Sequence, residues 1–160
     1  MDSSKPNIMG VLNITPDSFS DGGQYYDPDK ACQKVDQLIE ERADIIDIGG
    51  ESTKPESVDV SAVEELRRVQ PVIDYVQKNR LYNTVSFSVD TYKAEVAEYA
   101  LRNGFVCVND VTALRGDHNM IDVLLCFRPY IIIMYSKDHT PRTTRTPVIY
   151  KDVIAEIKVF

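Results

Sequence analysis

Short apolar segments alternate with amphipathic segments along almost the whole chain. Five apolar runs of strand length are each followed by a stretch whose apolar residues recur every three or four positions, which is the spacing of a helix. Such an alternation of strands and helices indicates a parallel α/β sheet with right-handed crossovers. The strands are expected at 8–12, 43–49, 84–89, 105–108 and 130–134.

The expected helices carry local start and stop signals. Asp27 and Pro28 combine an N-cap with a first-turn proline, and Ser61 with Glu64 forms a capping box. Gly104 supplies the glycine that commonly ends a helix. The strands are continuous apolar runs, so we expect a sheet that is covered on both faces. The helices are expected at about 28–42, 61–76, 94–103, 118–127 and 150–160.

Length and charge narrow the class of protein. The 160 residues fit one domain, 1–160, and the net charge of −7 implies no basic surface for nucleic acid or an anionic membrane. No apolar run approaches the ~18 residues of a transmembrane helix, and the N-terminus lacks the apolar core of a signal peptide. Cys32, Cys107 and Cys126 lie far apart without metal-ligand spacing, and Cys107 is expected to be a buried thiol. We therefore expect a cytoplasmic protein.

Polar side chains gather where each expected strand ends, whereas the junctions from helix back to strand are bland. In a parallel α/β sheet the carboxyl ends of the strands meet at one edge, which is where ligands bind. The sequence therefore predicts a ligand site on that edge. Its candidate residues are Asn13, Thr15, Asp17 and Ser18, then Glu51, Ser52, Thr53 and Lys54, then Asp90 and Thr91, then Asn109, Asp110 and Thr112, then Tyr135, Ser136 and Lys137.

Two of these side chains have competing interpretations. Asp90 either caps the following helix or has a role at a ligand, where it binds paired ring N–H donors or stabilises positive charge. Asn109 is either a turn residue or a donor and acceptor for a ligand. Asp110 is expected to brace the loops rather than to contact a ligand.

The first and second polar loops have the chemistry of an anion and cation site. Asn13 offers one amide oxygen to a hard cation such as Mg²⁺, with waters and ligand phosphate completing the shell. Thr53 is expected to contact phosphate oxygens and Lys54 to supply charge, unless Lys54 is a solvated surface lysine. His118 and His139 have no partner at catalytic spacing and are expected to be exposed to solvent.

Four stretches together resemble one family. Residues 9–23, MGVLNITPDSFSDGG, resemble the first signature of dihydropteroate synthases, and 47–55, DIGGESTKP, the second. SVDTYKAEV at 88–96 and VNDVT at 108–112 resemble the ends of that family's third and fourth strands. The resemblance runs from about residue 7 to the end of the chain, in the family's order and spacing.

The resemblance implies a TIM barrel and a transferase of folate biosynthesis. Such enzymes condense 4-aminobenzoate with 6-hydroxymethyl-7,8-dihydropterin diphosphate, giving dihydropteroate and pyrophosphate. Asn13 would bind Mg²⁺ and the diphosphate, and Thr53 would contact the diphosphate. Asp90 and Asn109 would hydrogen-bond the pterin, and Asp90 would stabilise the cation that forms when the diphosphate leaves. The residues expected to enclose aminobenzoate are Ser52, Pro55 and Phe19, and those expected beside the pterin ring are Val111 and Met134.

The chain also departs from the family. Lys54 stands where the family usually has Arg, which predicts charge without bidentate phosphate contact. Tyr135 and Ser136 follow Met134, where the family usually has a Met-His-Met run. Full-length members are expected to be homodimers.

A complete (β/α)₈ barrel takes roughly 250 residues, whereas this chain holds five βα units. The resemblance therefore indicates an N-terminal portion, with the family's later Asp, Lys, Arg and His ligands absent. We expect an incomplete barrel with bare first and fifth strands and without full synthase activity. Two alternatives are a non-catalytic pterin-binding or assembly module, and the pterin-binding domain of a corrinoid-dependent methyltransferase.

Overall fold

A single sheet of five parallel strands forms the centre of the molecule. The computed structural model describes residues 5–15, 27–54, 57–136 and 149–160. Within them the strands pair in the order β1-β2-β3-β4-β5, each parallel to its neighbour. The bounds are β1 Met9–Asn13, β2 Ile45–Gly49, β3 Ser86–Asp90, β4 Cys107–Asp110 and β5 Tyr130–Ile133.

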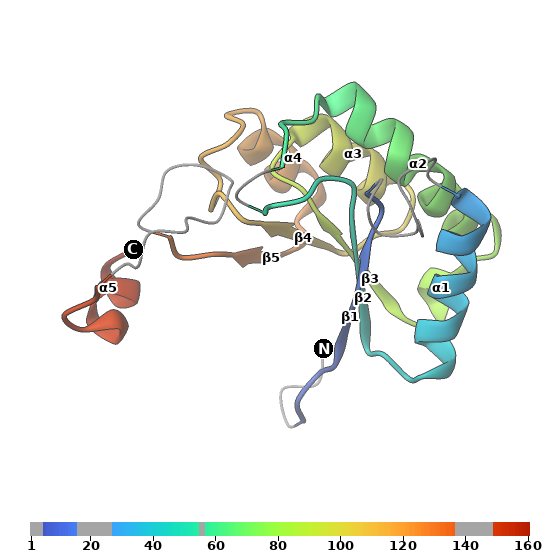
Figure 1. Cartoon of the computed structure of the whole chain (residues 1–160), viewed down its shortest axis with the longest axis horizontal. Helices are drawn as coiled ribbons and strands as arrows, with labels where there is room; N and C mark the ends of the chain where they lie inside the picture. The colour runs from blue at the N-terminus through green and yellow to red at the C-terminus, as the bar shows by residue number, and fades with distance from the viewer. Residues whose placement is uncertain (1–4, 16–26, 55–56, 137–148) are drawn as a thin grey trace.

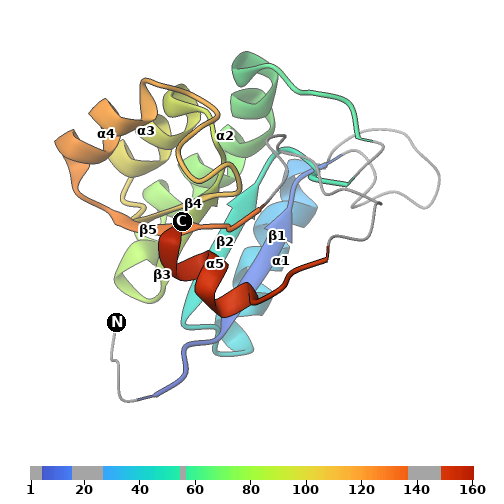
Figure 2. The same ribbon diagram turned by 90° about the vertical axis from the view of Figure 1, so that its left-hand side faces the viewer.

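The first four helices lie together on one face of the sheet (Figure 1). Figure 2 shows α1 behind β1, while α5 stands in the foreground. Consecutive strands with their helices on a single face form the wall of a (β/α) barrel, whereas a doubly wound sheet reverses its strand order. The expected fold class, an incomplete barrel of five parallel units, is confirmed. The helix bounds are α1 Pro28–Glu40, α2 Ala62–Lys78, α3 Ala94–Arg102, α4 Met120–Phe127 and α5 Val153–Val159, with a short 3₁₀ turn, η1, at Leu81–Asn83.

Side chains on each strand alternate between the helix-covered face and the opposite, inner face. The covered face is apolar and includes Leu12, Ile46, Ile48, Phe87 and Val108, all buried. The strand register places the inner residues in two rows across the sheet. We call the row nearer the carboxyl ends the upper row; it contains Asn13, Gly49, Asp90, Asn109 and Ile132. The lower row contains Val11, Asp47, Ser88, Cys107 and Tyr130.

The local signals in the sequence operate as expected at three helix ends. The Asp27 carboxylate accepts hydrogen bonds from the backbone N–H groups of Asp29 and Lys30, and Ser61 accepts one from that of Glu64. Gly104 has a φ of 95°, the left-handed conformation that glycine adopts at low cost.

Several predicted boundaries were wrong by a few residues. Helix α1 ends at Glu40 rather than at 42, α4 begins at Met120 rather than at 118, and α5 is limited to Val153–Val159. Strands β1–β4 begin one or two residues later than expected, because the parallel ladder, not the start of the apolar run, sets where pairing begins. Strand β5 begins at Tyr130, as expected.

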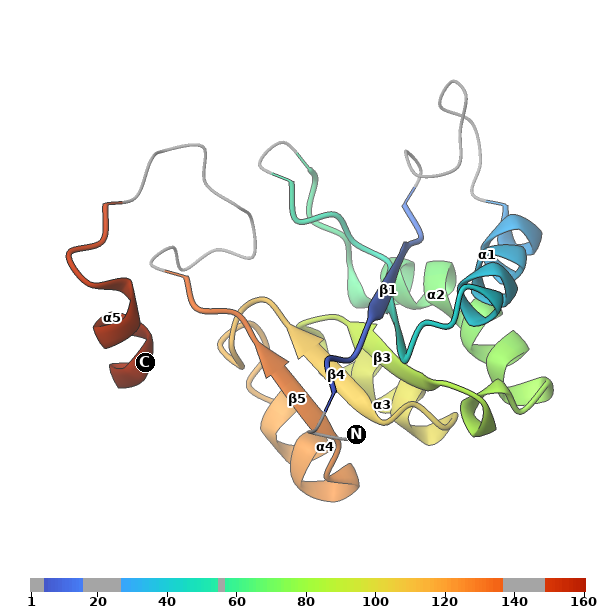
Figure 3. The same ribbon diagram turned by 90° about the horizontal axis from the view of Figure 1, so that it is seen from below.

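The expectation that both faces of every strand are covered was wrong for the two edge strands. On β1 the inner-face residue Val11 is 56% exposed. Strand β5 is uncovered along its whole length. All four of its residues are exposed, between 38% for Ile132 and 57% for Tyr130. Helix α5 has no buried residue and lies apart from α1–α4 (Figure 3). It contacts the loops instead, with Phe160 against the Tyr135 ring and beneath the Arg115 guanidinium. The bare fifth strand is the feature expected of an open barrel.

No helix in the described part of the chain is long and apolar enough to cross a membrane.

We expect Gly104→Ala to lower the free energy of unfolding by about 1 to 3 kcal/mol, since alanine is strained at positive φ. An added Cβ would also lie 2.7 Å from the Tyr82 ring. Urea unfolding followed by circular dichroism measures the change, and Glu95→Ala on the exposed side of α3 is the matched control. Equal stability of both variants would show that Gly104 is not required at this turn.

Candidate functional site

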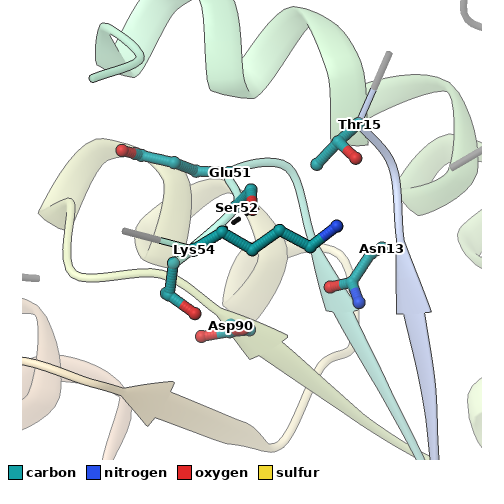
Figure 4. A pocket seen from close by; sticks show the side chains of 7 residues that line it. Asn13, Thr15, Glu51, Ser52, Lys54 and Asp90 are labelled. Carbon is teal, nitrogen blue, oxygen red and sulfur yellow. Dashed lines mark hydrogen bonds between the residues drawn. The ribbon is translucent and has the colours of Figure 1, made fainter. Parts of the chain in front are cut away.

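A cavity of about 170 Å³ lies beyond the carboxyl ends of β1, β2 and β3. Its lining is mostly polar and comes from three separate chain segments, which the parallel sheet brings together (Figure 4). The predicted site edge is therefore where the structure places a cavity. The lining residues are Asn13, Thr15, Glu51, Ser52, Thr53, Lys54 and Asp90.

Asn13 and Asp90 face each other across Gly49. The three residues are partners in the strand register, Asn13 on β1 with Gly49 on β2 and Gly49 with Asp90 on β3. A Cβ built on Gly49 would lie 3.3 Å from Asp90 Oδ2 and 3.6 Å from Asn13 Oδ1. The absence of a side chain at Gly49 leaves the room between these two polar groups into which a ligand can enter.

The second loop carries the positive charge of the cavity. Figure 4 shows the Lys54 side chain extending across the cavity, with its ammonium group toward Asn13 and Thr15. The backbone N–H of Lys54 donates to Ser52 Oγ at 3.3 Å, which forms a small turn at the start of the loop. Lys54 is therefore exposed to solvent and also lines the cavity. Thr53 and Ser52, which precede it in the chain, line the same cavity.

Asp90 is not the cap of the next helix. Helix α3 begins after Lys93, and the first free N–H group, that of Ala94, donates to Asp117 Oδ2 at 2.9 Å. Burial, followed by the nearby negative charges of Asp47 and Glu65, raises the pKa of Asp90 to about 7. An aspartate held at this pKa changes charge near neutral pH and favours any ligand that brings positive charge or N–H donors.

Asn109 lies next to Asp90 on the neighbouring strand and is its register partner. It is part of β4 rather than of a turn, and its Nδ2 donates to Asp47 Oδ2 at 2.9 Å. Asp110 braces the loop, as expected, because its carboxylate accepts from the N–H groups of Thr112 and Leu114 and from the Thr112 hydroxyl. The Asp110 carboxylate is therefore engaged in the loop and does not line the cavity.

The remaining predicted residues lie at the same edge or outside the described residues. Val111 and Met134 follow β4 and β5, are partly buried, and do not line the cavity. Phe19, Pro55 and His139 lie outside the described residues, as do Asp17 and Ser18. His118 is exposed, as expected.

A buried ion cluster joins the second loop to two helices. The ammonium group of Lys93, at the start of α3, donates to Glu51 after β2 and to Glu65 on α2. Burial raises the pKa of Glu65, which Lys93 only partly opposes. Burial alone would lower the pKa of Lys93, but the charges and hydrogen bonds of Glu65 and Glu51 outweigh it and raise that pKa. We refer to Lys93, Glu51 and Glu65 as the ion cluster.

The ion cluster and Gly50 hold the loop that carries Ser52, Thr53 and Lys54. The Gly50 carbonyl accepts from Arg68 Nη1 at 2.9 Å, and a Cβ at Gly50 would lie 2.9 Å from both Glu65 Cγ and Val69 Cγ1. The loop can therefore approach α2 only because residue 50 has no side chain. The cavity wall is anchored at both Gly50 and Glu51.

The residues at the cavity are compatible with a magnesium ion that takes a single protein ligand. Asn13 directs an amide oxygen toward the space beside Gly49. Among the described residues no group of three His, Cys, Asp or Glu side chains could hold a metal ion. Mg²⁺ commonly keeps several waters and takes its other ligands from phosphate oxygens, so one protein ligand is consistent with its chemistry.

The sequence predictions missed the residues behind the cavity. Asp47, Glu65 and Lys93 were not assigned roles, yet each contacts or supports a predicted site residue. One signal was available, because a single Asp within the apolar run Ile-Ile-Asp-Ile-Gly indicates a charged group inside the sheet. No local pattern marks the partners of Lys93.

Comparison with known proteins gives consistent matches. The family model for pterin binding enzymes matches residues 9–160. The dihydropteroate synthase of Staphylococcus haemolyticus is 44% identical over 135 residues, covering 84% of this chain and 49% of that protein. That of Haemophilus influenzae is 42% identical over 160 residues, covering 100% of this chain and 56% of that protein. The chain thus spans about half the length of these relatives.

Solved structures agree with the fold. A dihydropteroate synthase from Clostridium difficile, determined in the presence of pteroic acid, superposes with a TM-score of 0.79 at 44% identity, covering 96% of this chain and 54% of the other. The enzyme from Xanthomonas albilineans with 4-aminobenzoic acid has a TM-score of 0.81 at 39% identity, covering 96% and 52%.

Replacing Lys93 by Met removes the positive charge that pairs with two buried carboxylates, those of Glu51 and Glu65. We expect Lys93→Met to lower the free energy of unfolding by about 3 to 5 kcal/mol. The loss should be larger at pH 8 than at pH 5, because raised carboxyl pKa values remove stability as the pH rises. Urea unfolding at both pH values measures it, with Lys78→Met at the exposed end of α2 as control. Adding Glu51→Gln and Glu65→Gln should recover part of the loss, and no recovery would contradict this charge-based account.

Asp90→Asn removes the ionisable group at this position and keeps nearly the same side-chain shape, so it tests how the charge of Asp90 affects stability. Because the folded pKa is raised from 3.8 to about 7, Asp90 contributes stability that is present below pH 3.8 and lost as the pH rises through 7. We therefore expect Asp90→Asn to gain up to about 4 kcal/mol relative to the unmodified chain between pH 4 and pH 8. Urea unfolding at pH 4, 6 and 8 tests this, with the exposed Asp122→Asn as control. Parallel pH curves for the unmodified chain and Asp90→Asn would rule out a raised pKa.

Proposed function

The chain belongs to the family of pterin-binding enzymes, and we propose that its site serves the dihydropteroate synthase reaction. In that reaction 4-aminobenzoate and a hydroxymethyl-dihydropterin diphosphate give dihydropteroate and pyrophosphate. The observation that supports this most directly is the upper row, in which Asn13, Asp90 and Asn109 lie side by side around the space at Gly49. Lys54 and Asp90 line the cavity together with Asn13.

The pterin is assigned to Asp90 and Asn109. A pterin ring carries N–H donors along one edge, and Asp90 offers a carboxylate beside the amide of Asn109. The raised pKa of Asp90, caused first by burial, means that a ligand bringing N–H donors recovers hydrogen bonds that water cannot supply there. Val111 and Met134, at the ends of the neighbouring strands, are assigned to the ring's apolar faces.

The diphosphate is assigned to the side of the cavity formed by the second loop. Thr53 and the Lys54 ammonium group lie there, close to Asn13 in the same cavity. Lys54 attracts a diphosphate as a point charge, whereas the planar fork of an arginine would bind it bidentately. Ser52, with Pro55 and Phe19 from outside the described residues, is assigned to the aminobenzoate.

A magnesium ion fits beside Asn13, where it would supply charge that favours departure of the diphosphate. Asn13 would contribute one amide oxygen to its coordination. The protein's own part is to hold Asn13, at the end of β1, close to Lys54 in the loop after β2, which the register of β1 with β2 and the anchored Gly50 accomplish.

The bond changes are a substitution at the pterin's exocyclic carbon. The carbon–oxygen bond to diphosphate breaks and its electron pair leaves with the diphosphate. The amine nitrogen of 4-aminobenzoate forms the new bond to that carbon and then loses a proton. Positive charge that develops on the pterin is stabilised by the Asp90 carboxylate, which is already in place before the reaction.

A second candidate, pterin binding without turnover, is favoured by the open sheet. Among the described residues no strand pairs with the outer edge of β5, whose residues are exposed, so water reaches the space that a closed barrel would exclude. Water that reaches a reacting centre weakens its electrostatic stabilisation. We therefore expect this 160-residue chain to bind a pterin and to form little dihydropteroate by itself.

A combined titration and turnover assay tests both candidates. Titrating 6-hydroxymethylpterin by intrinsic ligand fluorescence reports binding, and a discontinuous assay with 4-aminobenzoate, the pterin diphosphate and Mg²⁺ reports dihydropteroate. We expect pterin binding that Asp90→Asn weakens about tenfold or more, as for a lost charged hydrogen bond. Absence of pterin binding contradicts the proposed function, and rapid turnover contradicts the expectation of low activity.

Lys54→Met provides a separate test of the diphosphate assignment. We expect it to weaken pyrophosphate binding, measured by calorimetry with Mg²⁺ present, by about five- to tenfold, and Lys54→Arg to restore or improve it. Lys34→Met on α1 is the matched control for loss of one charge. Equal affinities for Lys54→Met and Lys34→Met would remove Lys54 from the diphosphate site.

A further inference from the structure

Asp47 is a buried acidic residue on the inner face of the sheet, one row below the cavity. It is 2% exposed, and it pairs in register with Ser88, which is fully buried. Among the described residues Asp47 Oδ1 and Ser88 Oγ have no hydrogen-bond partner. Burying a carboxylate with one oxygen unsatisfied costs free energy, so Asp47 is a poor choice for packing alone.

The other oxygen of Asp47 has a specific partner. Asp47 Oδ2 accepts a hydrogen bond from Asn109 Nδ2 at 2.9 Å, across 62 residues of sequence. A carboxylate can only accept, whereas an amide has a donating and an accepting end. Asp47 is therefore compatible with one of the two orientations of the Asn109 amide, the one that turns the NH₂ group toward β2.

The fixed orientation determines what Asn109 offers to a ligand. With its NH₂ group turned to Asp47, the amide oxygen lies on the other side of the amide plane. Asp90 is the register partner of Asn109 on the adjacent strand and contributes a carboxylate in the same row. The site then presents two acceptors on neighbouring strands, which suits a ring edge with N–H donors and disfavours one with acceptors.

We propose that Asp47 is a positioning residue that holds the Asn109 amide in its accepting orientation and so selects a donor-bearing ring edge. The choice of ring rests on the proposed function, whereas the orientation of Asn109 does not. Ser88 occupies the same lower row and is equally buried, and its hydroxyl makes no hydrogen bond to Asn109 within the described part of the chain. It therefore supplies the matched control.

The orientation is tested without any ligand by the side-chain amide signals of Asn109 in ¹⁵N–¹H spectra, identified by their loss in Asn109→Ala. In the unmodified chain one of the two amide protons should exchange with water at least about tenfold more slowly than the other, because it is held by Asp47. Asp47→Asn can donate as well as accept, so it permits both orientations. We expect its Asn109 signals to shift and to lose that protection, and Ser88→Ala to retain it.

The consequence for recognition is tested with two rings that differ in the group at C2. 6-Hydroxymethylpterin carries a 2-amino donor beside an N1 acceptor, whereas 6-hydroxymethyllumazine carries a 2-oxo acceptor beside an N1–H donor. We expect the unmodified chain and Ser88→Ala to prefer the pterin by about tenfold or more, the range of one mismatched buried hydrogen bond. Asp47→Asn should reduce that preference to about threefold or less, since Asn109 can then turn its NH₂ group to the lumazine.

The outcomes separate this inference from the proposed function. A chain that binds neither ring contradicts the proposed function, and the amide spectra then decide the role of Asp47 alone. Equal, rapid exchange of both Asn109 amide protons in the unmodified chain would falsify the positioning role, even if the pterin binds. Should Asp47→Asn not fold, Asp47→Ser withdraws the acceptor with a smaller side chain, and the spectrum of the unmodified chain still tests the orientation of Asn109. Unchanged ring preference in a folded Asp47→Asn also overturns the proposal.

Discussion

Everything at the site depends on the register of the parallel strands. Four neighbouring strands pair so that Asn13, Gly49, Asp90 and Asn109 fall in one row. Because side chains alternate along a strand, a slip of one residue in any pair would turn a polar group of this row toward the helices. The apolar residues between them, such as Ile48 and Val89, would then face the cavity. Burial of those residues against α1–α4 therefore positions the polar ones.

A surplus of negative charge around one lysine shapes the chemistry of the cavity. Glu51 and Glu65 surround Lys93, and Asp47, Glu65, Asp110 and Glu51 all add to the burial that raises the pKa of Asp90. The environment close to Asp90 favours bound N–H donors and positive charge, while the Lys54 ammonium group is turned toward Asn13 and Thr15 in the same cavity (Figure 4). A ligand with a donor-bearing ring at one end and an anionic group at the other matches this separation of charge.

In the described part of the chain the sheet is open at β5. The relatives are about twice as long, and β5 exposes every one of its residues. In a barrel, each strand is satisfied by a neighbour on both sides, and the inner rows are sealed from solvent. Here the rows end at Tyr130 and Ile132, which are exposed by 57% and 38%. Within the described residues the upper row runs without a gap from β1 to β4. The inner face is not sealed from solvent at β5.

The sequence by itself determined the fold class, the helix caps and the edge at which the site lies. These depend on local patterns, such as the apolar periodicity, the Asp27 cap and the polar residue directly after each strand. It also identified Asn13, Lys54 and Asp90, which the structure brings into one cavity. Only the tertiary structure determined which side chains hold these residues in place. Asp47 and its partner Asn109 are 62 residues apart in the sequence, and Lys93 and its partner Glu51 are 42 apart. Such pairs form only where strand register and helix packing bring distant side chains together, so no local pattern predicts them.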